Sequence, residues 1–222
     1  MMNQELTDPR ILVLVSGSGS NLQALIEATR ERDYPGQIVA VGSNRPDVLA
    51  LERAKRAGIE TFTVDHQKFG SRNEFDTALK AEIERHSPDV VVLAGFMRIL
   101  TPGFVNAFRG RMLNIHPSLL PKYTGLNTHQ RALDAGDQRH GVSIHFVTED
   151  LDGGPVIAQA EVAVAADDDA QSLAARVQQQ EHVLYPIVLR WFCEGRVQLD
   201  DEHATFDGTP LTQPLVLPAE EA

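Results

Sequence analysis

The sequence predicts an α/β fold: a doubly wound, mostly parallel, twisted sheet with helices on both faces and an antiparallel edge. Four short apolar runs rich in β-branched residues alternate with segments of helical periodicity, which is typical of successive βαβ units. Because the runs are apolar throughout, each strand is expected to be buried on both faces, as in a sheet covered by helices. They are residues 11–15, 38–41, 90–93 and 112–115.

The segments between these runs predict helices over residues 21–32, 47–57, 72–86 and 127–135. Ser20 and Asp47 stand where the first two helices begin, and side chains of these types commonly cap a helix N-terminus. Gly58 follows the second helix, as glycine often does at a helix end.

The pattern changes after Gly141. Residues 142–147, VSIHFV, alternate in character, and a Gly-Gly turn at Gly153 and Gly154 leads into a second extended segment, residues 155–164. We therefore expect an antiparallel edge in this part of the sheet.

The C-terminal part begins with one long amphipathic helix, predicted over residues 168–194 and carrying acids at its start. Residues 196–208 predict a small hairpin, followed by a Pro-rich, frayed end. No internal repeat or low-complexity linker divides the chain, so we expect a single domain over residues 1–222.

The chain is acidic, with 31 acidic and 20 basic residues and a formal net charge of −11 at pH 7. The negative electrostatic field of such a chain repels nucleic acids and acidic membranes, so small molecules are the expected partners. Any phosphate must be bound by local groups. The single cysteine, Cys193, fits a reducing compartment. No signal peptide or membrane-spanning run is present, so the cytoplasm is the expected location.

The first predicted strand leads into residues 16–21, SGSGSN, and directly into a helix. Small residues leave backbone N–H groups open at the positive end of the helix dipole, which favours an anion. Leu22 replaces the third glycine of the dinucleotide fingerprint, and no Gly-Lys-Ser/Thr of a P-loop follows. We interpret the loop as a phosphate site, with a plain strand-to-helix turn or a dinucleotide site as alternatives.

A second candidate site, residues 114–121 (NIHPSLLP), lies at the end of a predicted strand, where ligands bind in open α/β sheets. Strand alternation puts Asn114 and His116 on one face. An amide donor beside an imidazole suits a reaction that develops negative charge on a carbonyl oxygen. The alternative is a structural histidine beside an asparagine that caps a turn.

An acidic turn, residues 150–155 (DLDGGP), offers Asp152 as a partner for His116, because a nearby carboxylate favours a protonated imidazole. Such turns are more often plain hairpin turns, and spacing alone does not bring the two residues together. His145 fits either a supporting role behind the site or a purely structural one.

These motifs follow one another in the order of a known family. SGSGSNLQALI, VVLAGFMRIL, LNIHPSLLPKY and LDGGPVI, with QQQEHVLYP in the long helix, resemble phosphoribosylglycinamide formyltransferase from residue 11 to about residue 196. The resemblance implies a formyltransferase-like fold with a Rossmann-type N-terminal half. It also implies a phosphate-binding half (1–110), a catalytic and folate-binding half (111–200) and a C-terminal hairpin and tail (201–222).

The resemblance implies an enzyme of purine biosynthesis that moves the formyl group of 10-formyltetrahydrofolate to the amine of phosphoribosylglycinamide, without a metal. It assigns catalysis to Asn114, His116 and Asp152. The phosphoribosyl substrate is assigned Gly19, Ser20, Asn21, Gln178 and Glu181. The folate is assigned Arg72, Met97, Arg98, Ile99, Leu100, Asn114, Thr148, Asp150, Leu151 and Asp152.

The expected reaction is direct attack of the glycinamide amine on the formyl carbon. Asn114 would donate to the developing oxyanion, and protonated His116 would stabilise it and protonate the leaving folate nitrogen. Asp152, with a water, would collect the proton lost by the amine.

Other functions stay open at this point. A formyltetrahydrofolate hydrolase would use the same three residues with water as nucleophile, and usually carries an N-terminal regulatory domain. A methionyl-tRNA formyltransferase carries a nucleic-acid-binding barrel, for which this chain is too short and too acidic. A non-catalytic phosphoribosyl-ligand sensor would need only the helix N-terminus. A metallohydrolase using His116, His129 and Asp152 is disfavoured because no H-E-x-x-H motif is present. A homodimer is also left open.

The sequence departs from the family in one loop. Bacterial relatives commonly read PKYPG followed by a histidine, whereas Thr124 here replaces the proline and Asn127 the histidine. The departure bears on any role of this loop, His129 included, and leaves the three catalytic residues unaffected.

Overall fold

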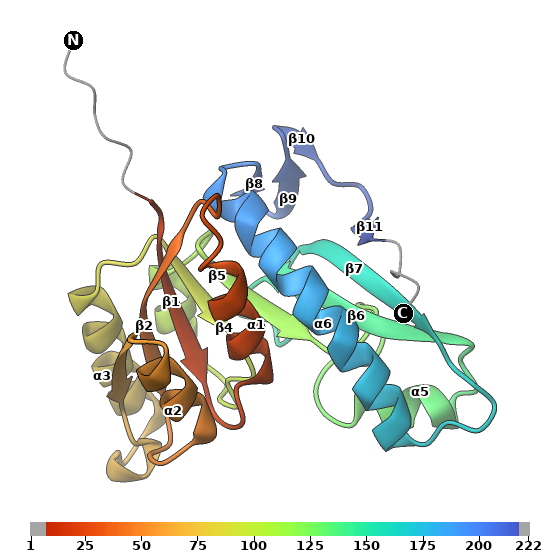
Figure 1. Ribbon diagram of the computed structural model, residues 1–222, viewed down its shortest axis with the longest axis horizontal. Coiled ribbons are helices and arrows are strands. Elements are labelled where there is room, and N and C mark those ends of the chain that lie inside the picture. The colour runs from red at the N-terminus through yellow and green to blue at the C-terminus, as the bar shows by residue number, and fades with distance from the viewer. Residues whose placement is uncertain (1–7, 218–222) are drawn as a thin grey trace.

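The computed structural model describes residues 8–217. Its main sheet has the strand order β11-β7-β6-β5-β4-β1-β2-β3, in which β6 runs antiparallel to both neighbours and every other adjacent pair is parallel (Figure 1). The predicted fold class is confirmed. The strands are β1 (Arg10–Val15), β2 (Gln37–Ser43), β3 (Glu60–Thr63), β4 (Val90–Leu93), β5 (Met112–His116), β6 (Arg139–Phe146), β7 (Val156–Ala163) and β11 (Leu215–Leu217).

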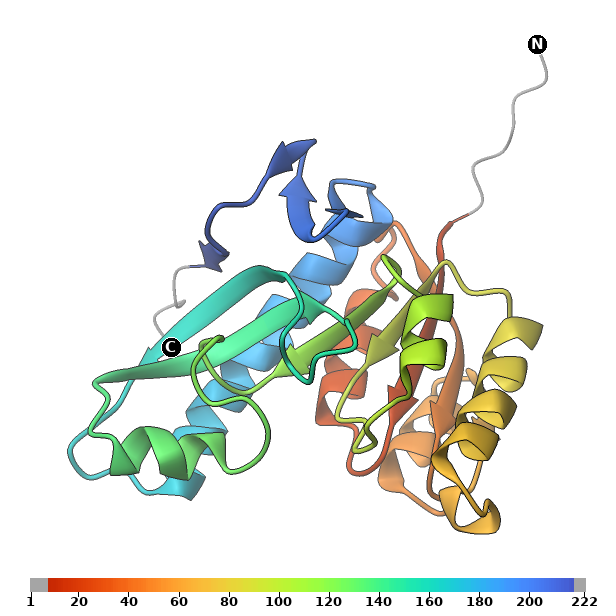
Figure 2. The same ribbon diagram turned by 180° about the vertical axis from the view of Figure 1, so that it is seen from behind.

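Helices cover both faces of this sheet, as predicted. Side chains of α1, α2, α5 and α6 pack against one face, and those of α3 and α4 against the other (Figures 1 and 2). The helices are α1 (Ser20–Ala28), α2 (Leu49–Arg56), the short 3-10 helix η1 (His66–Lys68), α3 (Arg72–Arg85), α4 (Pro102–Ala107), α5 (Thr128–Asp134) and α6 (Ala170–Cys193).

The alternation along β5 decides which way the candidate catalytic residues face. Leu113 and Ile115 lie in the core under α1 and α6, whereas Met112 lies in the core under α3 and α4. Asn114 and His116 therefore point to the face of α3 and α4. On that face, the segments that follow β5 and β6 lie over part of these two strands (Figure 2).

Two predicted helix caps, Ser20 and Asp47, are wrong. The first residue before α1 is Gly19 in the left-handed conformation (φ 72°), and Ser20 is already helical. The residue before α2 is Val48, and Asp47 precedes it with φ 54°. Neither helix has a side-chain cap. The first helix also ends at Ala28, before the predicted residue 32.

The antiparallel strands were predicted correctly, but they do not form the edge of the sheet. β6 is buried along nearly all its length. The edge strand is β11, which pairs with β7 in parallel register, so the segment predicted as frayed is in part a strand.

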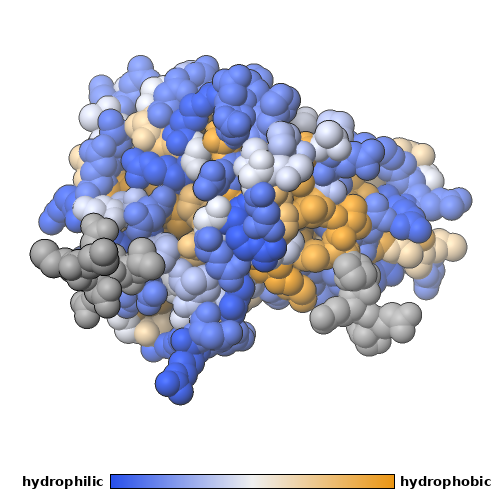
Figure 3. Space-filling model, turned by 90° about the horizontal axis from the view of Figure 1, so that it is seen from above, coloured by the Kyte–Doolittle hydropathy of each residue, from blue (hydrophilic) through white to orange (hydrophobic). Residues whose placement is uncertain are grey.

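A separate small sheet is formed by β8 (Val197–Asp200), β9 (His203–Phe206) and β10 (Thr209–Pro210). Seen from the side of this small sheet, hydrophilic residues cover most of the surface around a band of hydrophobic ones (Figure 3).

Candidate active site

Three adjacent parallel strands end at the same edge of the sheet and bring the predicted site segments together. β1, β4 and β5 are neighbours, and they are followed by residues 16–19, 94–101 and 117–127. The sheet changes from parallel to antiparallel pairing between β5 and β6. Ligands of open α/β sheets bind at such carboxyl ends.

Two backbone carbonyls of the loop before α1 accept hydrogen bonds from α2. Gly17 O accepts from Ala50 N at 3.1 Å, and Ser18 O accepts from Arg53 Nε at 2.9 Å. A Cβ at Gly19 would lie 2.6 Å from Ala50 Cβ, so only glycine fits this approach to α2. Since α1 has no side-chain cap, its first N–H groups are open to an anion.

Two side chains of α6 contact this helix start. Gln178 Nε2 donates to Ser20 Oγ at 3.1 Å, and Asn21 Nδ2 donates to Glu181 Oε2 at 2.7 Å. Burial raises the pKa of Glu181, while the hydrogen bond from Asn21 opposes this shift. Asn21 Oδ1 is buried and has no hydrogen-bond partner among the described residues. The five residues assigned to the phosphoribosyl substrate thus form one cluster.

Asn114 is held by a histidine from the neighbouring strand. It lies opposite His145 in the antiparallel pairing of β5 with β6, and its Nδ2 is 3.1 Å from His145 Nε2. Because His145 Nδ1 lies 2.8 Å from Phe146 O, Nδ1 carries the proton and Nε2 accepts from Asn114. Desolvation lowers the pKa of His145, which keeps this imidazole neutral.

His116 and Asp152 lie side by side although 36 positions separate them in the chain. His116 Nδ1 is 3.4 Å from Asp152 Oδ2, and each side chain is 7% exposed. His116 Nε2 is 2.8 Å from Tyr123 O, and Asp152 Oδ2 also accepts from Gly125 N at 2.8 Å. With an acceptor beside each ring nitrogen, the doubly protonated imidazole matches both neighbours.

Asp152 reaches this position through an unusual backbone conformation. Its φ of 52° lies in the left-handed region, where aspartate is tolerated better than most residues. Its second carboxylate oxygen is 3.9 Å from His145 Nε2. The carboxylate therefore stands between the two histidines of β5 and β6.

The residues assigned to the folate fall on two segments beside this cluster. The segment after β4 exposes Met97 (64%) and Ile99 (54%) and buries Leu100, and the loop after β6 exposes Leu151. These segments are linked through α4, which directly follows the first of them: Asn106 Nδ2 donates to Glu149 Oε1 at 2.7 Å. Thr148 and Asp150 line a separate cavity on the side of Arg109 and Glu202.

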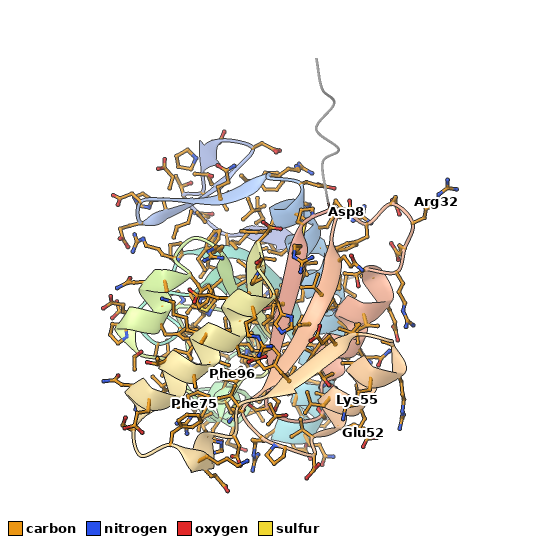
Figure 4. All side chains as sticks on the ribbon, turned by 90° about the vertical axis from the view of Figure 1, so that its left-hand side faces the viewer. Asp8, Arg32, Glu52, Lys55, Phe75 and Phe96 are labelled. Atoms are coloured by element: carbon orange, nitrogen blue, oxygen red, sulfur yellow. The ribbon has the colours of Figure 1, made fainter. Side chains whose placement is uncertain are left out.

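The two arginines assigned to the folate lie near α3. Arg72 is the first, exposed residue of α3, and the Arg98 guanidinium stands over the ring of Phe75, 5.2 Å from its centroid. Figure 4 shows Phe75 and Phe96 on the α3 side of the sheet, where both belong to one core cluster.

The loop that departs from the family is ordered by other contacts. Asn127 adopts φ 57° immediately before α5, a conformation that asparagine tolerates, and Thr124 O accepts from Arg131 Nη1 at 2.6 Å. His129 contacts His140, Nδ1 to Nε2 at 3.1 Å, and not Asp152. Residues 8–217 contain no group of three or more His, Cys, Asp or Glu side chains arranged to hold a metal ion.

Sequence reasoning assigned no definite role to His145 and did not single out Tyr123 or Gly125. The predicted antiparallel segment included His145, but no sequence pattern predicts the register that places it opposite Asn114 in the pairing of β5 with β6. The contact of His116 with a backbone carbonyl has no sequence pattern.

The sequence of this chain is similar to that of known proteins over most of its length. The family model described as formyl transferase matches residues 9–189. The phosphoribosylglycinamide formyltransferase of Escherichia coli is 55% identical over 201 residues, which cover 90% of this chain and 95% of that protein. The human trifunctional purine biosynthetic protein adenosine-3 is 47% identical over 192 residues, covering 86% of this chain and 19% of that longer protein.

Solved structures agree with these relatives. The phosphoribosylglycinamide formyltransferase of Coxiella burnetii has a TM-score of 0.91 at 47% identity, covering 96% of this chain and 100% of that one. The glycinamide ribonucleotide transformylase 1 of Symbiobacterium toebii has a TM-score of 0.88 at 40% identity, covering 93% and 97%.

The chain therefore belongs to the formyl transferase family, whose members transfer a one-carbon group. Within that family it belongs with the phosphoribosylglycinamide formyltransferases, over nearly its whole length. Among residues 8–217, no helix has the length and apolar character needed to cross a membrane.

Proposed function

We propose that this enzyme transfers the formyl group of 10-formyltetrahydrofolate to the amine of phosphoribosylglycinamide, in purine biosynthesis, and that Asn114, His116 and Asp152 carry out the chemistry. The observation that carries this assignment is the convergence of His116 and Asp152, 3.4 Å apart, beside an asparagine whose orientation is fixed by His145. Convergent polar groups at the carboxyl edge of an α/β sheet are typical of a catalytic site.

The phosphoribosyl substrate binds at the start of α1. Its phosphate accepts hydrogen bonds from the open N–H groups of Gly19, Ser20 and Asn21, which suits an anion bound by a chain of net charge −11. Gln178 and Glu181, which contact this helix start, bind the ribose and glycinamide portion.

The folate binds between the segment after β4 and the loop after β6. Met97, Ile99, Leu100 and Leu151 supply apolar walls for a flat pterin, and backbone groups of both segments pair with its edge. Arg72 and Arg98 supply cations for the glutamate tail, and the remaining assigned residues, Thr148 and Asp150, belong to the loop that closes over the pterin.

The proton balance follows from the contacts of His116. Because Nε2 faces the Tyr123 carbonyl, Nδ1, which lies beside Asp152, is the ring atom that donates the proton. The amine attacks the formyl carbon, the second N–H of Asn114 stabilises the oxyanion, and His116 protonates the folate nitrogen as its bond to carbon breaks. Asp152, through a water, takes the proton that the amine loses. No metal takes part.

Analysis of the products decides between this reaction and its nearest rival. The enzyme is incubated with both substrates, and formylated glycinamide, formate and tetrahydrofolate are quantified together. Formylated glycinamide equal in amount to the tetrahydrofolate is the expected result. Formate in its place would assign the chain to the hydrolases, and no turnover with unchanged ligand binding would support the non-catalytic sensor. Added EDTA is expected to leave the yield unchanged.

A further inference from the structure

The side chain of Ser16 lies where three adjacent strands end. Ser16 follows β1, Asn44 follows β2, and Met97 belongs to the segment after β4, and these strands are neighbours in the order β4-β1-β2. Ser16 and Asn44 are each only 2% exposed. Ser16 Oγ donates to Asn44 Oδ1 at 2.5 Å and accepts from Met97 N at 2.8 Å.

These two contacts fix the orientation of the hydroxyl group. A serine hydroxyl has one proton, and an amide oxygen can only accept, so the proton points to Asn44 and a lone pair is left for the Met97 N–H. Asn44 is itself anchored, because its backbone oxygen accepts from His66 N at 3.2 Å and from His66 Nδ1 at 2.7 Å. The acceptor for Met97 is thus held rigidly.

The backbone of the segment after β4 is held by few hydrogen bonds. Residues 95–101 have no regular secondary structure. The segment is tied at its ends by Ala94 N, which donates to Leu14 O at 2.9 Å, and by Thr101 N, which donates to Asp76 Oδ2 at 2.6 Å. The bond from Met97 N to Ser16 fixes its middle, where the Met97 side chain is exposed.

The loop that begins at Ser16 has anchors that do not involve this hydroxyl. Its carbonyls at Gly17 and Ser18 accept from Ala50 and Arg53 of α2. Loss of the hydroxyl group therefore removes the hydrogen bond that fixes the middle of the segment after β4, and it leaves the start of α1 in place.

We propose that Ser16, although it lies in the SGSGSN motif of the phosphate site, is a positioning residue for the folate, with Asn44 as its orienting partner. The inference rests on the proposed function, which places the folate against Met97 and its neighbours. A buried hydrogen bond that aligns a binding segment contributes up to about a tenfold change in affinity. The loss of affinity is expected for the folate and not for the phosphoribosyl substrate.

The test compares Ser16→Ala with wild type in steady-state assays of both substrates. The KM for 10-formyltetrahydrofolate is expected to rise about tenfold, and the KM for phosphoribosylglycinamide to change less than about twofold. Ser18→Ala, the same exchange at an exposed position of the same loop, is expected to leave the folate KM unchanged. Asn44→Ala, which frees the hydroxyl to turn, is expected to raise the folate KM by a smaller factor.

The outcomes separate this inference from the proposed function. An unchanged folate KM in Ser16→Ala, or an equal rise of both KM values in a variant with wild-type thermal stability, would overturn the positioning role. If Ser16→Ala does not fold, Asn44→Ala decides, since an unchanged folate KM there has the same consequence. A wild-type protein that transfers no formyl group would overturn the proposed function itself.

Discussion

Two histidines on neighbouring strands of the site have different surroundings and therefore different chemistry. His145 is desolvated, its pKa is lowered, and it accepts a hydrogen bond from Asn114. His116 faces a carboxylate on one side and a carbonyl on the other, so its protonated form is matched at both nitrogens. We propose that the neutral ring of His145 orients Asn114 as the oxyanion donor and that His116 supplies the proton.

Removing the charge of Asp152 tests this division at the residue scale. Asp152→Asn keeps the shape of the side chain but removes the charge beside His116, so formyl transfer at neutral pH is expected to fall by about a hundredfold or more. The measurement is kcat at neutral pH for both proteins.

The control for this measurement is Asp200→Asn, the same exchange at an exposed position of the small sheet. It is expected to reproduce the wild-type kcat. A variant at Asp152 that keeps wild-type activity at neutral pH would separate the carboxylate from the acid step.

At the scale of elements, α6 carries Gln178 and Glu181, which are proposed to bind substrate, and its start is defined by side-chain caps. Asp169 accepts from Gln171 N and Ser172 N, and Ser172 Oγ accepts from Asp169 N, which completes a capping box. Asp169→Ala is expected to lower the free energy of unfolding by about 1 kcal/mol, measured by urea denaturation. Asp167→Ala, at an exposed neighbouring position, should change it by less than about 0.5 kcal/mol.

The contact between α5 and β6 makes stability depend on pH. Burial lowers the pKa of His140 to about 4, with His129 as the next cause, and burial also lowers the pKa of His129. Above pH 6.5, the pKa of a histidine in the unfolded chain, both rings are neutral in the folded and the unfolded protein. Proton binding then does not lower the free energy of unfolding. As the pH falls from about 6.5 to about 4, the unfolded chain binds protons first and the stability is lost.

Urea denaturation near pH 7 and near pH 5 measures this loss. His140→Gln removes one of the buried titrating rings, so the difference in unfolding free energy between the two pH values is expected to shrink. Asp137 opposes the shift of His140 and His116 adds to it, but both are weaker causes than burial and His129. The same difference in wild type and variant would contradict the role of His140.

Elements with a strong pattern could be predicted from sequence, and those set by tertiary contacts could not. The four apolar strands and α3 are found almost as predicted, because burial on both faces and a clear helical period determine them. β3 was missed because its residues, ETFT, are only half-buried at the sheet edge. β11 was missed because its three residues become a strand only by pairing with β7.

At the scale of the whole molecule, the topology assembles the site from segments far apart in sequence. The order of the motifs, spread over most of the chain, made the family predictable, and the alternation along β5 made Asn114 and His116 share a face. Contacts such as Asn21 with Glu181, 160 positions apart, follow from the packing of α1 on α6 and could be assigned only by resemblance. The main sheet runs unbroken across residue 110, between β4 and β5, and the single domain over residues 1–222 stays a prediction.

Separate parts of this assembly are proposed to bind the substrates and to carry out the reaction. In this proposal, the start of α1 and α6 bind the phosphoribosyl substrate, and the segments after β4 and β6 bind the folate. The residues at the end of β5 are proposed to act on the bonds that change. His116 is therefore proposed to act on the transition state more than on either bound substrate.

The most direct test of this claim is to measure single-turnover formyl transfer and the equilibrium binding of both substrates for His116→Ala and wild type. The transfer rate is expected to fall by about a hundredfold or more, while both dissociation constants stay within about twofold of wild type. A variant that transfers the formyl group at the wild-type rate, or that loses rate only in proportion to lost binding, would contradict the catalytic role of His116.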